Sequence, residues 1–438
     1  MKILKWFYII FNLQFVICNH LYAETSALKI DSGDTAWMLV STALVLLMTL
    51  PGLALFYGGL VRRKNILGVL MQCAVLLCVM SLQWVLFGYS LAFAPGNAFI
   101  GGLQWMGLNG VGLAPYADYA ATIPHQLFMV FQMMFAVITP ALIIGAFAER
   151  MKFSSFLLFS LLWATFVYDP VAHWVWGVGG WLRGMGALDF AGGTVVHINA
   201  GFAALVTALM IGKRKGYENA PTAPHNLPFT VIGAGLLWFG WFGFNAGSAL
   251  AANGLAVNAF VVTNIAAAAA GLSWAVIEWM MSGKPTTLGV ATGVVAGLVA
   301  ITPAAGFVSV IPAILIGLLV SVVCYIMVAF IKPRLGYDDA LDAFGVHGVG
   351  GLFGALITGV FATVAVNPAG ANGLLFGNAK QLYTQFVASG ATILYTVVAT
   401  AVIFKVVDMT LGMRVKEKAE YMGLDLAEHH EGAYTILE

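Results

Sequence analysis

The stretch Asp189-Phe-Ala-Gly-Gly-Thr-Val-Val-His197-Ile-Asn-Ala-Gly201 sets a carboxylate at the mouth of an apolar run and an imidazole about two helical turns further on. A second stretch, Asp342-Ala-Phe-Gly-Val-His347-Gly-Val-Gly-Gly351, repeats the pattern 150 residues later. Ionisable side chains inside membrane helices are costly and usually mark a pathway. The two stretches therefore predict a site built from two halves of one chain.

The composition indicates a membrane protein. Hydrophobic residues make up 61% of the 438 residues and charged residues only 9%, whereas soluble domains carry about a quarter charged residues. The 50 glycines suit close packing of helices in lipid. With a net charge of +1 and no long basic run, the chain is not expected to bind nucleic acid. The four cysteines lack metal-ligand spacing, so we expect no metal and no cofactor.

Apolar stretches near the length that spans a bilayer, about 20 residues, recur along the chain. We therefore predict an all-α polytopic fold with about eleven transmembrane helices. The predicted spans are 36–61, 67–94, 124–148, 153–176, 192–212, 227–247, 256–281, 288–303, 307–331, 345–364 and 384–411.

Lysine and arginine residues predict the orientation, because cytoplasmic loops are the basic ones. The alternate, poorly basic loops hold only Arg183 and Lys380, and the segment before the first span holds Lys29. We therefore expect the mature N-terminus outside and the C-terminus inside. The residues that follow every second span are Arg62, Arg63, Lys64, Arg150, Lys152, Lys213, Arg214, Lys215, Lys284, Lys332, Arg334, Arg414, Lys416 and Lys418.

The two ends of the chain differ from the membrane domain, which we place at 24–412. Residues 1–23 combine a short basic start, an apolar run and a small residue at the end, which is typical of a secretory signal peptide. An uncleaved first helix is the alternative. Residues 413–438 are polar and are expected to form a cytoplasmic C-terminal tail.

The topology also suggests internal symmetry. Five predicted spans lead to the end of the first histidine stretch and five more end after the second. An odd number of spans per half inserts the halves in opposite orientations, as in many transporters whose site lies between the repeats. We expect an inverted five-helix repeat followed by a final helix, with His197 facing His347.

The chain resembles the ammonium transporter family (Amt/Mep/Rh), in particular its bacterial Amt branch. The resemblance covers about Asp34 to Tyr434. It implies a homotrimer in the bacterial inner membrane that moves ammonium or ammonia and is not an enzyme. The motifs that carry it are Pro51-Gly-Leu-Ala-Leu-Phe-Tyr-Gly-Gly-Leu60, Gly145-Ala-Phe-Ala-Glu-Arg150, Asp189 to Asn199, Gly240-Trp-Phe-Gly-Phe-Asn-Ala-Gly-Ser248 and Asp342-Ala-Phe-Gly-Val-His-Gly348.

The resemblance implies that His197 and His347 line the pore, although a lone buried histidine is more often a core residue. A neutral imidazole offers one donor and one acceptor, so two rings can share a hydrogen bond in an apolar tube. They could accept hydrogen bonds from ammonia or relay a proton.

The resemblance assigns five further residues to the outer half of the pore. Trp176, Phe131 and Ser248 would bind ammonium, because a cation is attracted to an aromatic face and a hydroxyl oxygen accepts its N–H groups. Phe135 and Phe244 would form the gate, an apolar constriction that excludes hydrated metal ions. The alternatives are an interfacial anchor for Trp176, core packing for the phenylalanines and a helix cap for Ser248.

Five more residues have weaker assignments. Trp241, Tyr57 and Thr302 are expected to line the pore. Asp189 and Asp342 are interpreted as structural or electrostatic residues that cap the helix starts before the two histidines, since carboxylates favour that position.

Two other functions remain open. The chain could be an ammonium sensor of the same fold, or a channel for another small solute such as methylamine, carbon dioxide or water. The C-terminal tail resembles the segment that meets the PII-type nitrogen-regulatory protein in the family, so that protein is a candidate partner.

Overall fold

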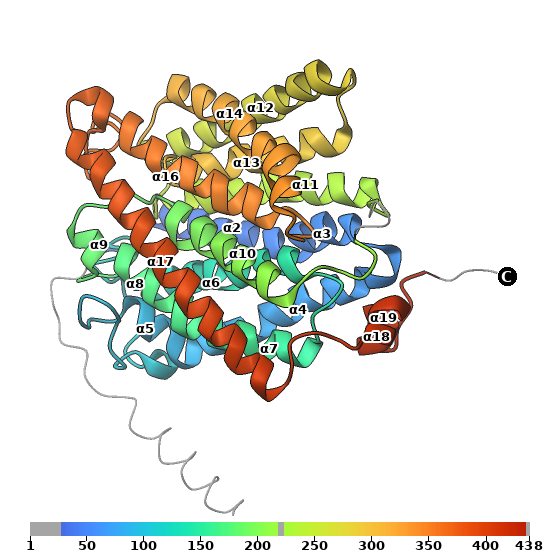
Figure 1. The fold of residues 1–438 in the computed structure, drawn as a ribbon. Helices are drawn as coiled ribbons and strands as arrows, with labels where there is room; N and C mark the ends of the chain where they lie inside the picture. Colours follow the sequence, from blue (N-terminus) through green and yellow to red (C-terminus); the bar gives the residue numbers. More distant parts are fainter. Residues whose placement is uncertain (1–27, 218–222, 435–438) are drawn as a thin grey trace, which may run out of the picture.

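The computed structural model describes residues 28–217 and 223–434, so the predicted signal peptide at 1–23 lies outside the described residues. Within those two ranges the chain is a bundle of helices without a β-strand, and the only β-type pairings are three isolated bridges (Figure 1). The predicted all-α fold is confirmed.

The helices run in chain order as follows: α2 (Ser32–Leu47), α3 (Ala54–Leu60), α4 (Ile66–Gln83), α5 (Tyr89–Phe93), α6 (His125–Phe147), α7 (Phe153–Trp163), α8 (Asp169–Trp176), α9 (Trp181–Gly184), α10 (Asn199–Ile211), α11 (Leu227–Trp241), α12 (Gly254–Ser282), α13 (Thr287–Ile301), α14 (Val310–Ile326), α15 (Lys332–Leu335), α16 (Val349–Phe361), α17 (Ala379–Thr410), α18 (Glu417–Met422) and α19 (Leu424–His429). Wider helical turns join several of them, among them η1 (Met48–Leu53), η6 (Gly193–Ile198), η7 (Phe242–Ala246) and η9 (Phe344–Gly348).

Ten helical stretches in the described ranges are long and apolar enough to cross a membrane. Each predicted span coincides with a helix within a few residues. The short predicted span at 288–303 corresponds to α13, an apolar helix of 15 residues that is buried among its neighbours. Burial inside the bundle explains how so short a helix remains stable without reaching across a bilayer by itself.

The two histidine stretches cross each other at glycines. A methyl group on Gly201 of α10 would lie 2.1 Å from the backbone nitrogen of Gly348, and one on Gly351 of α16 would lie 2.8 Å from Cβ of His197. Each of these two glycines stands four residues after a histidine. The reciprocal contact brings η6 and η9 together and is the arrangement that two oppositely inserted repeats would produce.

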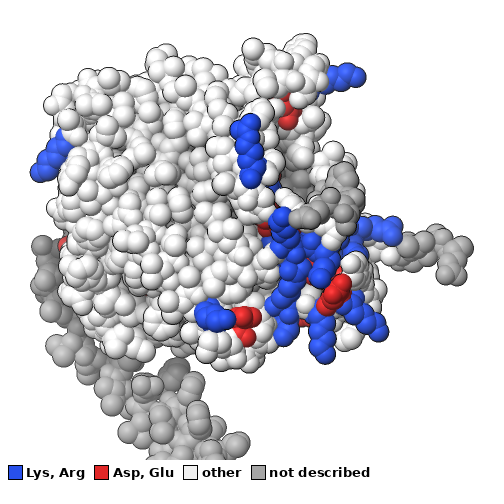
Figure 2. Space-filling model, viewed as in Figure 1, with Lys and Arg blue, Asp and Glu red and all other residues white. Residues whose placement is uncertain are grey.

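Charged side chains gather at one end of the bundle, beside α18 and α19, whereas α8 and α9 lie at the opposite end (Figures 1 and 2). We call the charged end the basic end. Its centre is the buried carboxylate of Glu149, which accepts hydrogen bonds from Arg62 and Arg214. Arg214 also pairs with Asp338 at 2.9 Å. Burial raises the pKa of Asp338, but the two neighbouring cations, Arg214 and Arg150, outweigh it and hold that pKa below its usual value.

The predicted tail packs onto the basic end. Glu420 of α18 accepts the backbone N–H of Lys215 at 2.6 Å. Asp425 of α19 accepts the N–H of Gly68 at 2.9 Å, and Leu424 donates its N–H to Asn65 at 2.8 Å. The tail therefore joins loops that are far apart in sequence.

Candidate functional site

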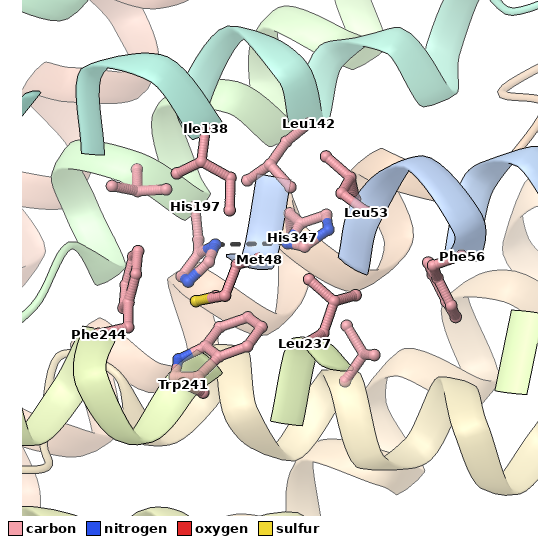
Figure 3. Close-up of a pocket in the computed structure, with 12 residues that line it drawn as sticks. Met48, Leu53, Phe56, Ile138, Leu142, His197, Leu237, Trp241, Phe244 and His347 are labelled. Carbon is pink, nitrogen blue, oxygen red and sulfur yellow. Dashed lines mark hydrogen bonds between the residues drawn. The ribbon is translucent and has the colours of Figure 1, made fainter. Parts of the chain in front are cut away.

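Two histidines meet in the middle of the bundle. Nδ1 of His197 in η6 lies 3.3 Å from Nδ1 of His347 in η9, and the ring planes are 18° apart (Figure 3). Since two hydrogen-bonded neutral rings need one donor and one acceptor, each Nε2 takes the opposite role. Nε2 of His197 is buried and has no partner among the described residues, so it is available to a molecule in the cavity beside it.

That cavity, the central cavity, has a volume of about 10 Å³, which is close to the room that one water-sized molecule needs. Its wall is apolar except for the two imidazoles and the indole of Trp241. Figure 3 shows the imidazoles between Phe244 and Phe56. The lining residues are Met48, Leu53, Phe56, Ile138, Leu142, Val196, His197, Leu237, Trp241, Phe244, Val295 and His347.

Trp241 holds one side of the central cavity. Its ring lies 5.5 Å from the ring of His197 at an angle of 24°. Its Nε1 donates to Oγ1 of Thr302 at 2.8 Å, and Thr302 in turn donates to the carbonyl of Leu298. Thr302 is therefore behind the wall rather than in it, which corrects its predicted pore-lining position. It fixes the plane of Trp241 instead.

A pair of phenylalanine rings closes the central cavity on one side. The rings of Phe135 in α6 and Phe244 in η7 are 4.3 Å apart and 30° from parallel. Trp176, at the end of α8, meets Phe135 edge-on at 5.8 Å. The predicted gate residues are thus in contact and lie beside the predicted binding tryptophan.

Beyond the phenylalanine pair, at the end opposite to the basic end, lies a second space of about 170 Å³ that we call the outer cavity. Ser248 lines it and donates its hydroxyl to the carbonyl of Phe244 at 2.9 Å, so its lone pairs remain free to accept. The full lining is Phe93, Asp118, Tyr119, Phe128, Gln132, Phe135, Trp176, Arg183, Phe190, Ser248 and Leu250.

Phe131 is the predicted binding residue that does not reach the outer cavity. Its side chain is fully buried, 5.0 Å from the ring of Phe135, and Gly247 packs closely against it. The four-residue spacing indicated that the two rings share one face of α6, but not how far that face is rotated toward the outer cavity. In the structure, Phe135 lines the outer cavity and Phe131 packs behind Phe135.

Asp189 caps η6, as the sequence suggested. Its Oδ1 accepts the N–H groups of Gly192 and Gly193, both at 2.7 Å, and its Oδ2 accepts those of Thr194 and Val195 at 2.8 and 3.0 Å. Burial raises the pKa of the Asp189 carboxyl, and the four donors oppose that rise. Both oxygens are occupied, so this carboxylate orders the segment that carries His197.

Asp342 does not cap the second histidine segment, and that expectation was wrong. The N–H of Phe344 goes to Oδ2 of Asp339 at 2.7 Å, whereas Asp342 pairs with Lys332 at 2.5 Å. Asp342 has a φ of 58°, in the left-handed region, and its Oδ1 accepts from Lys332 instead of from the helix start. The capping carboxylate is three residues earlier than predicted.

A third space of about 370 Å³, the inner cavity, opens at the basic end. Tyr57 lines it, and its hydroxyl donates to the carbonyl of Leu142 at 3.1 Å. His347, Phe56 and Val295 line both the inner and the central cavity. The contacting rings of Phe135 and Phe244 stand between the outer and central cavities, so the three spaces lie in series.

Sequence reasoning missed Gln132, the amide in the wall of the outer cavity. The signal was present: Phe128, Gln132 and Phe135 stand at i, i+4 and i+7 and therefore share one face of α6.

Residues 28–217 and 223–434 hold no cluster of three or more side chains that could together bind a metal ion.

Comparison with known proteins shows the family of the chain. The model of the Ammonium Transporter Family matches residues 36–434. The chain is 56% identical to an ammonium transporter of Bacillus subtilis over 92% of this chain and 98% of that protein. It is 52% identical to an ammonium transporter of Aquifex aeolicus, over 95% and 96% of the two chains.

Solved structures show the same fold. Candida albicans Mep2 superposes with a TM-score of 0.84 at 38% identity, covering 89% of this chain and 88% of Mep2. A protein described as a sensor Amt protein superposes with a TM-score of 0.83 at 29% identity, covering 91% and 98%. The family model covers most of the chain, and the relatives match nearly all of it. The chain therefore belongs to the Ammonium Transporter Family.

Proposed function

We propose that the three cavities form a pathway in which ammonium binds at the outer cavity, loses a proton, and crosses the bundle as ammonia. The chain is a multi-pass membrane protein of a transporter family, and its relatives are transporters rather than enzymes. The observation that carries the mechanism is the free Nε2 of His197 in an otherwise apolar space the size of one small molecule.

Binding takes place between Trp176, Phe135 and Ser248. A cation over an aromatic face gains about 0.5–2 kcal/mol. The Ser248 hydroxyl already donates to a carbonyl, so it accepts from the ligand, and ammonium offers only donors. Phe131 supports this site from behind by packing against the Phe135 ring.

The step through the phenylalanine pair provides selectivity. Phe135 and Phe244 offer no oxygen to replace the water ligands of a metal ion, so a potassium ion cannot shed its hydration there. Ammonium becomes neutral by releasing one proton to water in the outer cavity and then crosses as ammonia. In the central cavity, His197 and His347 supply the hydrogen bonds that the apolar wall lacks.

The remaining parts of the proposal rest on the resemblance and the topology. The protein resides in a bacterial inner membrane with its C-terminus inside and assembles as a homotrimer. The tail that docks on the basic end would present a surface to a PII-type regulatory protein.

Proteoliposomes with a pH-sensitive dye in the lumen test the function. After an ammonium jump, the rate of luminal pH change should exceed that of protein-free liposomes and should saturate with concentration, because a binding site precedes the pore. A rate equal to that of protein-free liposomes would overturn the proposal and favour a sensor.

A further inference from the structure

One polar side chain of the outer cavity has no part in the mechanism above. Gln132 lies on the cavity face of α6 between Phe128 and Phe135, and all three line the cavity. Its Oε1 atom is buried and has no hydrogen-bond partner among the described residues. Buried acceptors in folded proteins are almost always paired, so an unpaired one needs an explanation.

The amide is free to turn toward a ligand. The last bond of a glutamine side chain has a broad, two-fold preference, and a half-turn about it exchanges the oxygen and the NH₂ group. No hydrogen bond to Oε1 opposes that half-turn. A ligand that carries only donors selects the orientation in which Oε1 faces the cavity.

Two other polar groups of the cavity wall, those of Arg183 and Tyr119, already have partners. The guanidinium of Arg183 lies over the ring of Tyr119 and donates to the carbonyl of Trp176. The hydroxyl of Tyr119 donates to the carbonyl of Phe93 at 2.6 Å and accepts the N–H of Val178. Besides Ser248 and the exposed carboxylate of Asp118, the amide of Gln132 is the acceptor in the cavity wall that remains for a small cation.

We propose that the side-chain carbonyl of Gln132 accepts a hydrogen bond from the bound cation and sets the preference for ammonium over methylammonium. This inference rests on the proposed function. Ammonium has four N–H donors for Ser248, Gln132 and the aromatic faces. Methylammonium has three, and its methyl group, if turned toward the amide, leaves Oε1 unpaired again.

The test compares Gln132→Met with the native chain in proteoliposomes, with ammonium and methylammonium as substrates. The variant keeps the length of the side chain and removes the amide. KM for ammonium should rise about tenfold, as expected for one hydrogen bond to a charged group. KM for methylammonium should rise less than about threefold, with kcat unchanged for both.

Two further variants separate binding from packing. Gln132→Glu keeps the shape and always accepts, so it should retain the native preference for ammonium. Gln126→Met, on the same helix but outside the cavity lining, should behave as the native chain. Equal increases in both KM values for Gln132→Met, or a glutamate variant that behaves like the methionine variant, would overturn the inference. Failure of the native chain to transport at all would instead reject the proposed function.

Discussion

In the proposed pathway, His197 acts through the half of its ring that its neighbours leave unpaired. Nδ1 meets His347, the ring lies against Trp241, and Nε2 faces a space too small for a hydrated ion. An unpaired polar atom in an apolar wall is unfavourable while the space is empty and favourable when ammonia occupies it. In the proposed pathway, this imidazole nitrogen therefore provides a polar contact for ammonia in the central cavity.

Asp189 supports the same segment, and Asp189→Asn should damage it. Asparagine has one accepting oxygen, so its NH₂ group would face backbone N–H donors that now bond the second carboxylate oxygen. We expect a loss of about 2–4 kcal/mol in the free energy of unfolding, since two buried donors lose their partner.

The measurement for Asp189→Asn is thermal unfolding in detergent. The control is Glu431→Gln, which changes an exposed carboxylate in the tail in the same way. An unchanged melting temperature of the asparagine variant would show that the four N–H groups do not depend on the carboxylate.

Sequence patterns anticipated much at this scale but not which way side chains point. The paired motifs and the resemblance singled out His197, His347, Trp176 and Ser248. The structure places the two histidines in the wall of the central cavity and the other two residues in the wall of the outer cavity. Phe131 and Thr302 are not among the residues that line the outer and central cavities. The sequence could not show this, because helix rotation and packing behind a cavity wall are three-dimensional properties. The place of Gln132 in the cavity wall was not predicted, because an amide that shares a helix face with Phe128 and Phe135 is usually interpreted as part of the packing.

At the scale of the elements, the site depends on how closely α10 and α16 approach the histidine turns of the opposite half. Gly201 and Gly351 hold the same place after their histidines and each packs on the other half. Small residues allow such backbone contact between membrane helices. The distance between the two imidazoles follows from this contact.

Gly201→Ala should therefore prevent native packing. Its methyl group would lie 2.1 and 2.2 Å from the backbone N and Cα of Gly348, which cannot move aside as a flexible side chain would. Overpacking of this kind costs about 1–3 kcal/mol or more. We expect little monodisperse protein by size-exclusion chromatography and no saturable ammonium flux.

Gly235→Ala is the matched control, because a methyl group there meets nothing within 4 Å and the residue is exposed on α11. It should purify and transport like the native chain. A stable and active Gly201→Ala variant would mean that the two halves are not held by this contact.

The bounds of the elements were the most predictable feature, because hydropathy alone identifies apolar helices. The cap before His347 was predicted at the wrong carboxylate. Asp339 and Asp342 both precede that helix. The sequence does not show that Asp342 has a positive φ or that Asp339 is the residue that accepts the N–H of Phe344.

At the scale of the whole molecule, the proposed pathway consists of three cavities in series and not of one continuous channel. Aromatic rings separate the outer cavity from the central one, and His347 connects the central cavity to the inner one. No sequence pattern predicted three cavities, because each is formed by helices that are distant along the chain. The odd number of predicted spans per half predicts that the two halves are inverted, and the close contact of η6 with α16 and of η9 with α10 is compatible with that prediction.

The most direct test of whether ammonia passes the histidine pair is the ammonium flux of His197→Leu in proteoliposomes. Ammonium binding is measured on the same purified variant. Leucine fills a similar volume and removes the free Nε2. Ammonium flux should fall at least about tenfold, whereas ammonium binding at the outer cavity should stay unchanged. Only the later step in the central cavity has lost its hydrogen bond. His430→Leu, an exposed histidine in the tail, serves as the control. Native flux in His197→Leu would show that ammonia does not pass the histidine pair and would contradict the account.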